Sequence, residues 1–220
     1  MGHADGGDGA QAAVSTRRRR MGQTASDRSF RHRLRELLPS IALLGLLFVT
    51  RTTLANHYVV PSGSMEPTLQ PGDRVVVDMT AYGLRVPYTE TVLLPRDRPR
   101  RGDVVLLPSP ASGDRLIKRV VGVAGDRVTL AAGHLSVDGM PAGEGDMERI
   151  GDHAVPLNLS HGGGPDIDVV VPAGHVLVVG DNRGNSLDGR MFGFVRESAV
   201  YARARGVFWR SGERFTWQPL

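Results

Sequence analysis

The chain has 220 residues and a formal net charge of +4. The first 35 residues carry eight arginines against three aspartates, a net charge of +5, so the rest of the chain sums to −1. A nucleic-acid-binding domain needs basic residues spread over a folded face, and we therefore expect no nucleic-acid partner. Cysteine is absent, which excludes a thiol nucleophile, disulfides, cysteine-ligated zinc and iron–sulfur clusters.

Residues 1–36 combine Gly, Ala, Asp, Ser and Arg without apolar periodicity, a composition that predicts a disordered, Arg-rich tail. From Leu37 to Thr50 there is no charged residue, and if Arg51 extends its guanidinium to the interface the apolar stretch reaches Ala55. A helix of about nineteen residues is about 28 Å long, close to the ~30 Å hydrocarbon core of a bilayer. We therefore expect a transmembrane anchor over residues 37–56.

A signal peptide is the competing interpretation of the apolar stretch, with Thr53-Leu54-Ala55 as its processing site. The positively charged region before it would then be more than thirty residues long, so we prefer a retained anchor. Arginines are concentrated before the stretch, and only Arg51 follows it closely. The positive-inside rule then places the tail in the cytoplasm and residues 57–220 outside, with one membrane span.

After Tyr58, short β-branched runs alternate with Gly-, Pro- and Asp-containing turns, which predicts a mainly β body of antiparallel sheets. Residues 130–166 are rich in Gly, and we expect there a hairpin followed by a long loop, together a small β region inserted on the main sheet. The predicted strands are Val59–Val60, Arg74–Asp78, Asp103–Leu107, Ile117–Val123, Val128–Leu130, Leu135–Val137, Ile167–Val171 and His175–Val179.

Two serines, Ser62 and Ser64, flank a glycine in the segment PSGSMEPTL that begins at Pro61, directly after the predicted anchor. The prolines of this segment restrict the backbone and suit it to holding one hydroxyl exposed. A Ser-Gly-Ser sequence on its own is also typical of a solvated turn, so this segment needs a partner elsewhere in the chain.

Lys118 is the only lysine among 27 basic residues, and it lies in an apolar run with Ile117, Val120 and Val121. Burial of its amine would lower its pKa. Arginine cannot be deprotonated in a protein, so Lys118 is the one Lys or Arg side chain able to accept a proton from a serine near pH 7. A strand lysine that faces water is the alternative.

A third polar segment, GDNRGNSLDGR from Gly180 to Arg190, follows the apolar run HVLVV. It contains neither a histidine nor paired carboxylates at helical spacing. Taken alone, this segment predicts no more than a solvated turn.

Together the three segments resemble the bacterial type I signal peptidase family, the membrane-bound Ser/Lys endopeptidases that remove signal peptides. The resemblance covers about residues 37–197. The matched motifs, in the family's order and behind an N-terminal anchor, are PSGSMEPTL around Ser64, RGDVVLL from Arg101, KRVVGVAGD from Lys118 and GDNRGNSLDGR from Gly180.

Two positions depart from the family pattern. Ala124 stands where the family usually has proline before Gly-Asp, and Gly189 stands where a serine usually precedes the final arginine. Both departures concern loop detail. Lys118 occupies the position where eukaryotic-type relatives carry histidine, so the resemblance is to the prokaryotic form.

The resemblance implies a role for each matched residue. Ser64 would be the nucleophile and Lys118 the general base, while the Ser62 hydroxyl and the Ser64 backbone N–H would form the oxyanion hole. Ser186 would orient the Lys118 amine, and Met65 would contribute to the substrate pocket. No metal or other cofactor is expected. The residues expected to brace the third segment by ion pairs are Asp181, Arg183, Asp188 and Arg190.

The resemblance also implies the partners and the location. The substrates would be secretory preproteins whose signal peptides have small residues at positions −3 and −1, bound extended against a strand edge. The lipid bilayer would be the second partner. The protein would lie in the plasma membrane as a single-pass protein, with the catalytic domain on the extracellular face.

Three other interpretations of these residues compete with the signal peptidase family: a Ser-His-Asp hydrolase, a self-cleaving repressor and a binding domain. A Ser-His-Asp hydrolase could draw on His57, His134, His153, His161 or His175, but no Gly-x-Ser-x-Gly motif accompanies them. A self-cleaving repressor uses the same Ser/Lys pair but needs a helical DNA-binding head, where this chain has the predicted anchor. An anchored β domain that only binds partners would leave Ser64 and Lys118 inert.

Overall fold

The computed structural model describes residues 37, 39–40, 43–44, 56–85, 92–210, 212 and 215–220. The chain divides into two units, residues 1–50 and residues 51–220. The predicted tail lies outside the described residues, and so does most of the predicted anchor. No helix in the described part of the chain has the length and apolar character needed to cross a bilayer. Asn56, expected at the end of the anchor, instead begins a strand.

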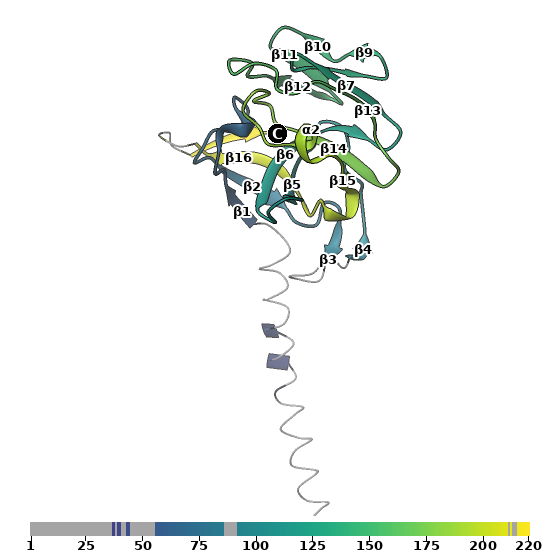
Figure 1. The fold of residues 1–220 in the computed structure, drawn as a ribbon. Coiled ribbons are helices and arrows are strands. Elements are labelled where there is room, and N and C mark those ends of the chain that lie inside the picture. Colours follow the sequence, from purple (N-terminus) through teal and green to yellow (C-terminus); the bar gives the residue numbers. More distant parts are fainter. Residues whose placement is uncertain are drawn as a thin grey trace, which may run out of the picture. The chain divides into compact units, whose positions relative to one another are not determined.

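The second unit is built mainly from antiparallel sheets, which confirms the expected fold class of the body (Figure 1). Its largest sheet has the order β1-β2-β16-β5-β6-β14-β15, and β17 pairs with β16. These strands are β1 (Asn56–Val59), β2 (Arg74–Asp78), β5 (Val104–Pro108), β6 (Arg115–Val123), β14 (His175–Val179), β15 (Val195–Arg196), β16 (Ala202–Trp209) and β17 (Phe215–Pro219).

Two smaller sheets lie between β6 and β14 in the sequence, in the part of the chain expected to carry an insertion. One has the order β13-β7-β8-β9, and the other has the order β10-β11-β12. The expectation of a long loop after the first hairpin was wrong, because four further short strands occupy that stretch. The strands of these sheets are β7 (Arg127–Ala131), β8 (His134–Val137), β9 (Met140–Pro141), β10 (Gly143–Glu144), β11 (Met147–Ile150), β12 (His153–Pro156) and β13 (Ile167–Val170).

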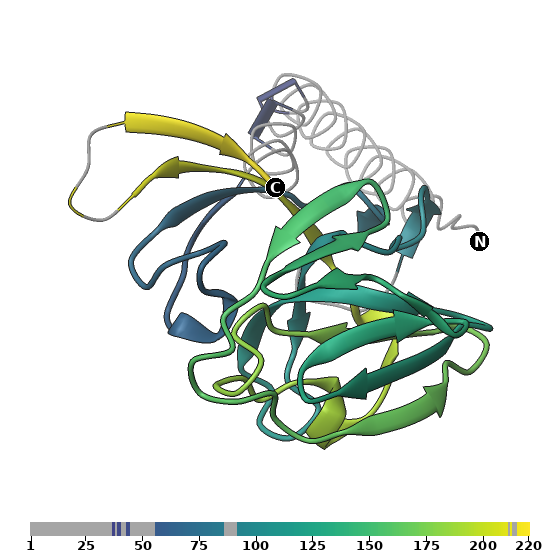
Figure 2. The same ribbon diagram turned by 90° about the horizontal axis from the view of Figure 1, so that it is seen from above.

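The remaining elements are short. Strands β3 (Gly83–Arg85) and β4 (Val92–Pro95) form a separate pair, and α2 (Gly189–Phe192) and the 3-10 helices η1 (Gly63–Met65) and η2 (Glu197–Ala199) join the strands. Viewed from above, β16 and β17 leave the body as a hairpin (Figure 2).

Strand β6 is the element that joins the two parts of the body. Ile117 packs in a core cluster with Val75 of β2 and Val207 of β16, whereas Val121 packs in another with Val128 and Leu135 of the smaller sheets. All of residues 117–122 are buried. A polar side chain on this strand is therefore held away from water.

Candidate active site

Ser64 lies in the 3-10 helix η1, between β1 and β2. Ser62 precedes the helix with an extended backbone, and the Glu66 N–H donates to the Gly63 carbonyl to close the turn. Ser64 is 8% exposed, so the residue has little contact with solvent. The sequence places a helical turn here because Pro61 and Pro67 restrict the chain on both sides of the serines.

Lys118 on β6 reaches the Ser64 hydroxyl. The amine Nζ lies 2.5 Å from Ser64 Oγ, and Lys118 is 3% exposed. Burial lowers the pKa of Lys118 to about 8, although the charges of Asp188 and Asp181 act in the opposite direction. The structure thus brings together the two residues that the sequence singled out, in a setting that favours a neutral amine.

Ser62 lies beside the same hydroxyl but on the open side. Its Oγ is 3.4 Å from Ser64 Oγ, a long hydrogen bond, and the residue is exposed. The Ser64 backbone N–H has no acceptor among the described residues. The Ser64 N–H is therefore an unpaired donor among the described residues, and the Ser62 hydroxyl makes only this long contact.

Met65 is the residue that the resemblance places in the substrate pocket. It is fully buried, in the core cluster with Val60, Leu69 and Val75. Met65 has no exposed area in the free protein, and its part in the substrate pocket stays a prediction. Its burial fixes η1 to the main sheet.

Asp181 and Arg119 form a buried ion pair next to the serine and the lysine. The Arg119 guanidinium donates to both carboxylate oxygens of Asp181 at 2.9 and 2.8 Å, and its third nitrogen donates to the Gly102 carbonyl. Thr68 Oγ1, four residues after Ser64, donates to the same carboxylate at 2.6 Å. The pair therefore ties β6 to the segment that carries Ser64.

Asp188 and Arg190 form a second buried pair within the 180–190 loop. The Arg190 guanidinium donates to both Asp188 oxygens at 2.9 and 2.8 Å, and Asp188 also accepts from the Gly180 N–H. Burial acts to raise the pKa of Asp188, but hydrogen bonds and charge from Arg190 outweigh it and hold that pKa below its ordinary value. Asp188 therefore stays charged and fixes the start of the loop.

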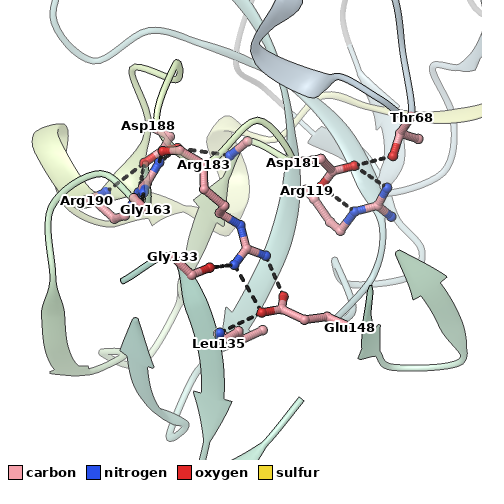
Figure 3. A network of polar contacts seen from close by, with 11 residues as sticks. Thr68, Arg119, Gly133, Leu135, Glu148, Gly163, Asp181, Arg183, Asp188 and Arg190 are labelled. Atoms are coloured by element: carbon pink, nitrogen blue, oxygen red, sulfur yellow. Dashed lines mark hydrogen bonds and ion pairs between the residues drawn. The ribbon is translucent and has the colours of Figure 1, made fainter. Parts of the chain in front are cut away.

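A third pair joins the loop to the smaller sheets (Figure 3). The Arg183 guanidinium donates to both oxygens of Glu148 on β11, and Arg183 also donates to the Gly133 carbonyl. Glu148 in turn accepts from the Leu135 N–H at 2.7 Å. Each of the four charged loop residues named from the sequence thus forms a buried ion pair.

Ser186 lies near the same centre, but it makes no hydrogen bond to Lys118. Its Oγ is buried and has no partner with ordinary hydrogen-bond geometry among the described residues, although it lies close enough to Asp188 to help lower the pKa of that carboxyl. Gly180 leaves room for this hydroxyl, because a Cβ at Gly180 would overlap both Ser186 Oγ and the Ser64 carbonyl. The loop thus lies in direct contact with η1.

Sequence reasoning missed several residues that build the site. Asn182, with no exposed area, contacts the backbone of η1, while Thr68 and Arg119 share Asp181. Arg119 and Asn182 stand beside residues that were named, so the matched motifs contained them. Glu148 lies in the Gly-rich stretch 130–166, outside the matched motifs, so only its ion pair with Arg183 shows its part in the site.

Two other arrangements of polar side chains are absent from the described part of the chain. It contains no group of three or more His, Asp or Glu side chains that could hold a metal ion. None of its histidines hydrogen-bonds to Ser64, and the ring nitrogens that do make contacts, in His161 and His175, bind Ser160 and the Ala173 carbonyl. A Ser-His-Asp arrangement is therefore not formed by these residues.

Comparison with known proteins shows the family of the chain. The family described as "Signal peptidase, peptidase S26" matches residues 34–209. The chain belongs to this signal peptidase family. It is 35% identical over 167 residues to "Signal peptidase I" of Pseudomonas aeruginosa, which covers 67% of this chain and 59% of that relative. The chain therefore spans less than two thirds of that protein.

Other signal peptidase relatives are matched over more of their length. "Signal peptidase I" of Leptolyngbya laminosa is 31% identical over 185 residues, which cover 79% of this chain and 80% of the relative. "Probable signal peptidase I-2" of Synechocystis is 34% identical over 165 residues, with coverage of 72% and 65%. A crystal structure of a signal peptidase I from Enterococcus faecalis aligns at 27% identity over 49% of this chain and 97% of its own, with a TM-score of 0.38, too low to inform on the fold.

Proposed function

We propose that this protein is a membrane-bound serine endopeptidase that cleaves signal peptides from secretory precursors, with Ser64 as nucleophile and Lys118 as general base. The observation that carries the proposal is the contact between the buried Lys118 amine and the Ser64 hydroxyl, at 2.5 Å. A lysine is a useful base only when its pKa is lowered toward the working pH, and burial provides this at Lys118.

In the acylation step, Ser64 Oγ attacks the scissile carbonyl while its proton moves to Lys118 Nζ. The carbonyl π electrons move onto oxygen and form the tetrahedral oxyanion. When the intermediate collapses, the C–N bond breaks and Lys118 returns the proton to the leaving amine. The product is the Ser64 ester of the signal peptide and a free mature N-terminus.

The oxyanion needs donors that are already in position. The Ser64 N–H and the Ser62 hydroxyl supply them in this proposal, since the first has no acceptor among the described residues and the second is exposed beside Ser64 Oγ. One such donor is typically worth about 10²- to 10³-fold in rate.

In deacylation, Lys118 takes a proton from water, and the resulting hydroxide attacks the ester carbonyl. Collapse of this second intermediate breaks the C–Oγ bond, and Lys118 returns the proton to Ser64. We propose that Ser186 orients the protonated amine during both steps, because its hydroxyl is buried beside this centre and has no partner with ordinary hydrogen-bond geometry in the described part of the chain.

The substrates in this proposal are extended precursor segments with small residues at −3 and −1, presented at the surface of a bilayer. The names of the relatives support the substrate class, and the uncharged stretch at 37–50 supports membrane attachment. The arginines before that stretch support a cytoplasmic N-terminus and a catalytic domain on the outer face of the plasma membrane.

The test is cleavage of a synthetic precursor by the full-length chain in detergent micelles. We expect Ser64→Ala to reduce kcat/KM by about 10³-fold or more, because the nucleophile is lost. Lys118→Arg should be nearly as inactive, since it keeps the charge but cannot become neutral. Ser136→Ala, on β8, is the matched control and should retain full activity.

Three outcomes would reject the proposal. Activity retained by Ser64→Ala would show that Ser64 is not the nucleophile, whereas a wild type that does not cleave would support a domain that only binds partners. Activity retained by Lys118→Arg would remove the neutral-amine base and leave the nucleophile in place. A second precursor with leucine in place of alanine at −1 should resist cleavage by the wild type, and equal cleavage of both would contradict the proposed substrate class.

A further inference from the structure

Asn182 lies at the centre of the contact between the polar loop and η1, although it takes no part in the proton transfers proposed above. Its side chain has no exposed area. Its backbone is held on the other side by Asn158, whose N–H donates to the Asp181 carbonyl and whose carbonyl accepts from the Arg183 N–H. Asn182 is therefore rigidly placed before it makes any contact with η1.

Two donors of Asn182 bind two consecutive carbonyls of η1. The backbone N–H donates to the Ser64 carbonyl at 3.2 Å, and the side-chain Nδ2 donates to the Gly63 carbonyl at 3.0 Å. These carbonyls belong to the peptide units on either side of the Ser64 Cα. Asn182 thus constrains the nucleophile from both of its peptide bonds.

The contact with the Gly63 carbonyl has a direct consequence for the proposed oxyanion hole. The Gly63 carbonyl and the Ser64 N–H belong to one peptide unit, which is planar and trans, so they point in opposite directions. Fixing the carbonyl therefore fixes the direction of the N–H. A hydrogen bond accepted by the carbonyl also polarises the peptide and strengthens its N–H as a donor.

The chemistry of the side chain fits this task. Asn182 Oδ1 is buried without a partner among the described residues, an unfavourable state for an amide that served only to fill space. Aspartate has the same shape but no donor, and it would place a negative charge against the Gly63 carbonyl. The amide is needed here for its N–H group.

We propose that Asn182 is a positioning residue that orients and polarises the Gly63–Ser64 peptide, so that the Ser64 N–H binds the oxyanion. This inference rests on the proposed peptidase function and deepens it. Asn182 touches neither substrate nor Ser64 Oγ in this assignment, and it acts only through the peptide that it binds.

The kinetic test measures kcat and KM on the synthetic precursor for the full-length chain. Asn182→Ala should lower kcat by about 10- to 100-fold with KM within about threefold, because the oxyanion forms only after the substrate is bound. Asn182→Asp should lose at least as much. The matched control is Asn185→Ala, an exposed asparagine of the same loop, which should retain wild-type constants.

A double variant tests whether Asn182 acts on the oxyanion. Ser62→Ala and Asn182→Ala should be non-additive in kcat, because both change the binding of one charge. Strictly additive losses would overturn the inference. It would also be overturned if unfolding of Asn182→Ala at the assay temperature accounted for the whole loss of kcat.

A spectroscopic readout separates the inference from the activity. Gly-Ser occurs once in the chain, at Gly63–Ser64, so labelling Gly with ¹³C at its carbonyl and Ser with ¹⁵N yields a single correlated amide signal. This signal should shift in Asn182→Ala and stay in place in Asn185→Ala. An unchanged signal would overturn the inference, whereas a wild type that does not cleave while the signal shifts would overturn the proposed function alone.

Discussion

Two neighbouring cations on β6 are buried to the same degree but lie in opposite electrostatic environments. Lys118 and Arg119 are each 3% exposed. Arg119 donates to both oxygens of a charged partner, Asp181, whereas Lys118 donates to the neutral hydroxyl of Ser64. No carboxylate in the described part of the chain forms an ion pair with the Lys118 amine. The charge of Arg119 is therefore balanced by a carboxylate, and that of Lys118 is not.

The same contrast separates the two regions that meet at the site. Around the 180–190 loop, every buried arginine has a carboxylate partner, as Figure 3 shows for Arg119, Arg183 and Arg190. Those pairs hold the loop in place. At the Ser64–Lys118 contact, burial without a partner makes the charged amine unfavourable, which is what a general base requires. The ion-paired region thus holds in place a Ser64–Lys118 contact in which the charged amine is unfavourable.

Replacing Lys118 by methionine should have the largest effect, because we expect activity to fall while stability rises. We expect kcat/KM to fall by about 10³-fold or more, because no base remains. At pH 7 the variant should nevertheless be more stable than the wild type by on the order of 3 kcal/mol, the cost of a pKa lowered from about 10.4 to about 8. Urea unfolding at pH 7 and pH 10 measures this difference.

The pH dependence of that gain has a definite sign. Below pH 8 the amine is charged in both states, so the folded wild type bears the full cost of burying it. Between pH 8 and about 10.4 only the unfolded state binds the proton, so wild-type stability rises with pH and the advantage of Lys118→Met shrinks. If Lys118→Met is less stable than the wild type at pH 7, burial of the charged amine does not destabilise the folded protein.

Replacing Arg119 by methionine tests the compensated side of the comparison. The Asp181 carboxylate would be left buried without its cation, and removal of one partner of a buried pair typically costs about 3–5 kcal/mol. We therefore expect a large loss of stability, the reverse of Lys118→Met, in urea unfolding at pH 7. Arg119→Met/Asp181→Leu should regain part of this loss, and a double variant no more stable than the single one would argue against an uncompensated charge as the cause.

The dependence of wild-type kcat/KM on pH tests the lowered pKa of Lys118 without a substitution. Lys118 must be neutral to accept the Ser64 proton, and its pKa is about 8. We expect kcat/KM to rise about tenfold per pH unit below pH 8 and to level off above it. Arg190→Lys keeps a cation near Asp188 and should leave this apparent pKa in place. A profile that is flat between pH 6 and pH 9 would exclude Lys118 as the titrating base.

Strands with β-branched runs were predicted from the sequence, and those without them were not. The bounds of β2 and β14 were predicted as observed, since RVVVD and HVLVV are typical strand sequences. Strand β16, which lies between β2 and β5, was missed. Its sequence ARARGVFW contains Ala, Arg and Gly, which favour strands weakly, and its small side chains are buried by the tertiary fold.

At the site, the sequence singled out the two proposed reacting groups, Ser64 and Lys118, but not the residues that hold them in place. Ser64 and Lys118 were recognised because their chemistry and motifs are local in the chain. The contacts of Asn182 with η1 and of Arg183 with Glu148 join segments that are 119 and 35 residues apart. Such pairs depend on how the sheets meet, and neither composition nor strand periodicity predicts them.

The smallest effect is expected at an ion pair that has the same geometry but lies in water. Arg127 donates to both oxygens of Asp168 at 2.9 and 2.7 Å, much as Arg183 does to Glu148, yet both partners are exposed. Solvent screens the first pair, and a charge left alone there is hydrated. We therefore expect Arg127→Met to leave the Tm unchanged while Arg183→Met lowers it by many degrees, in parallel thermal unfolding of the two variants. Equal losses would mean that bidentate geometry, and not burial, determines what these arginines contribute to stability.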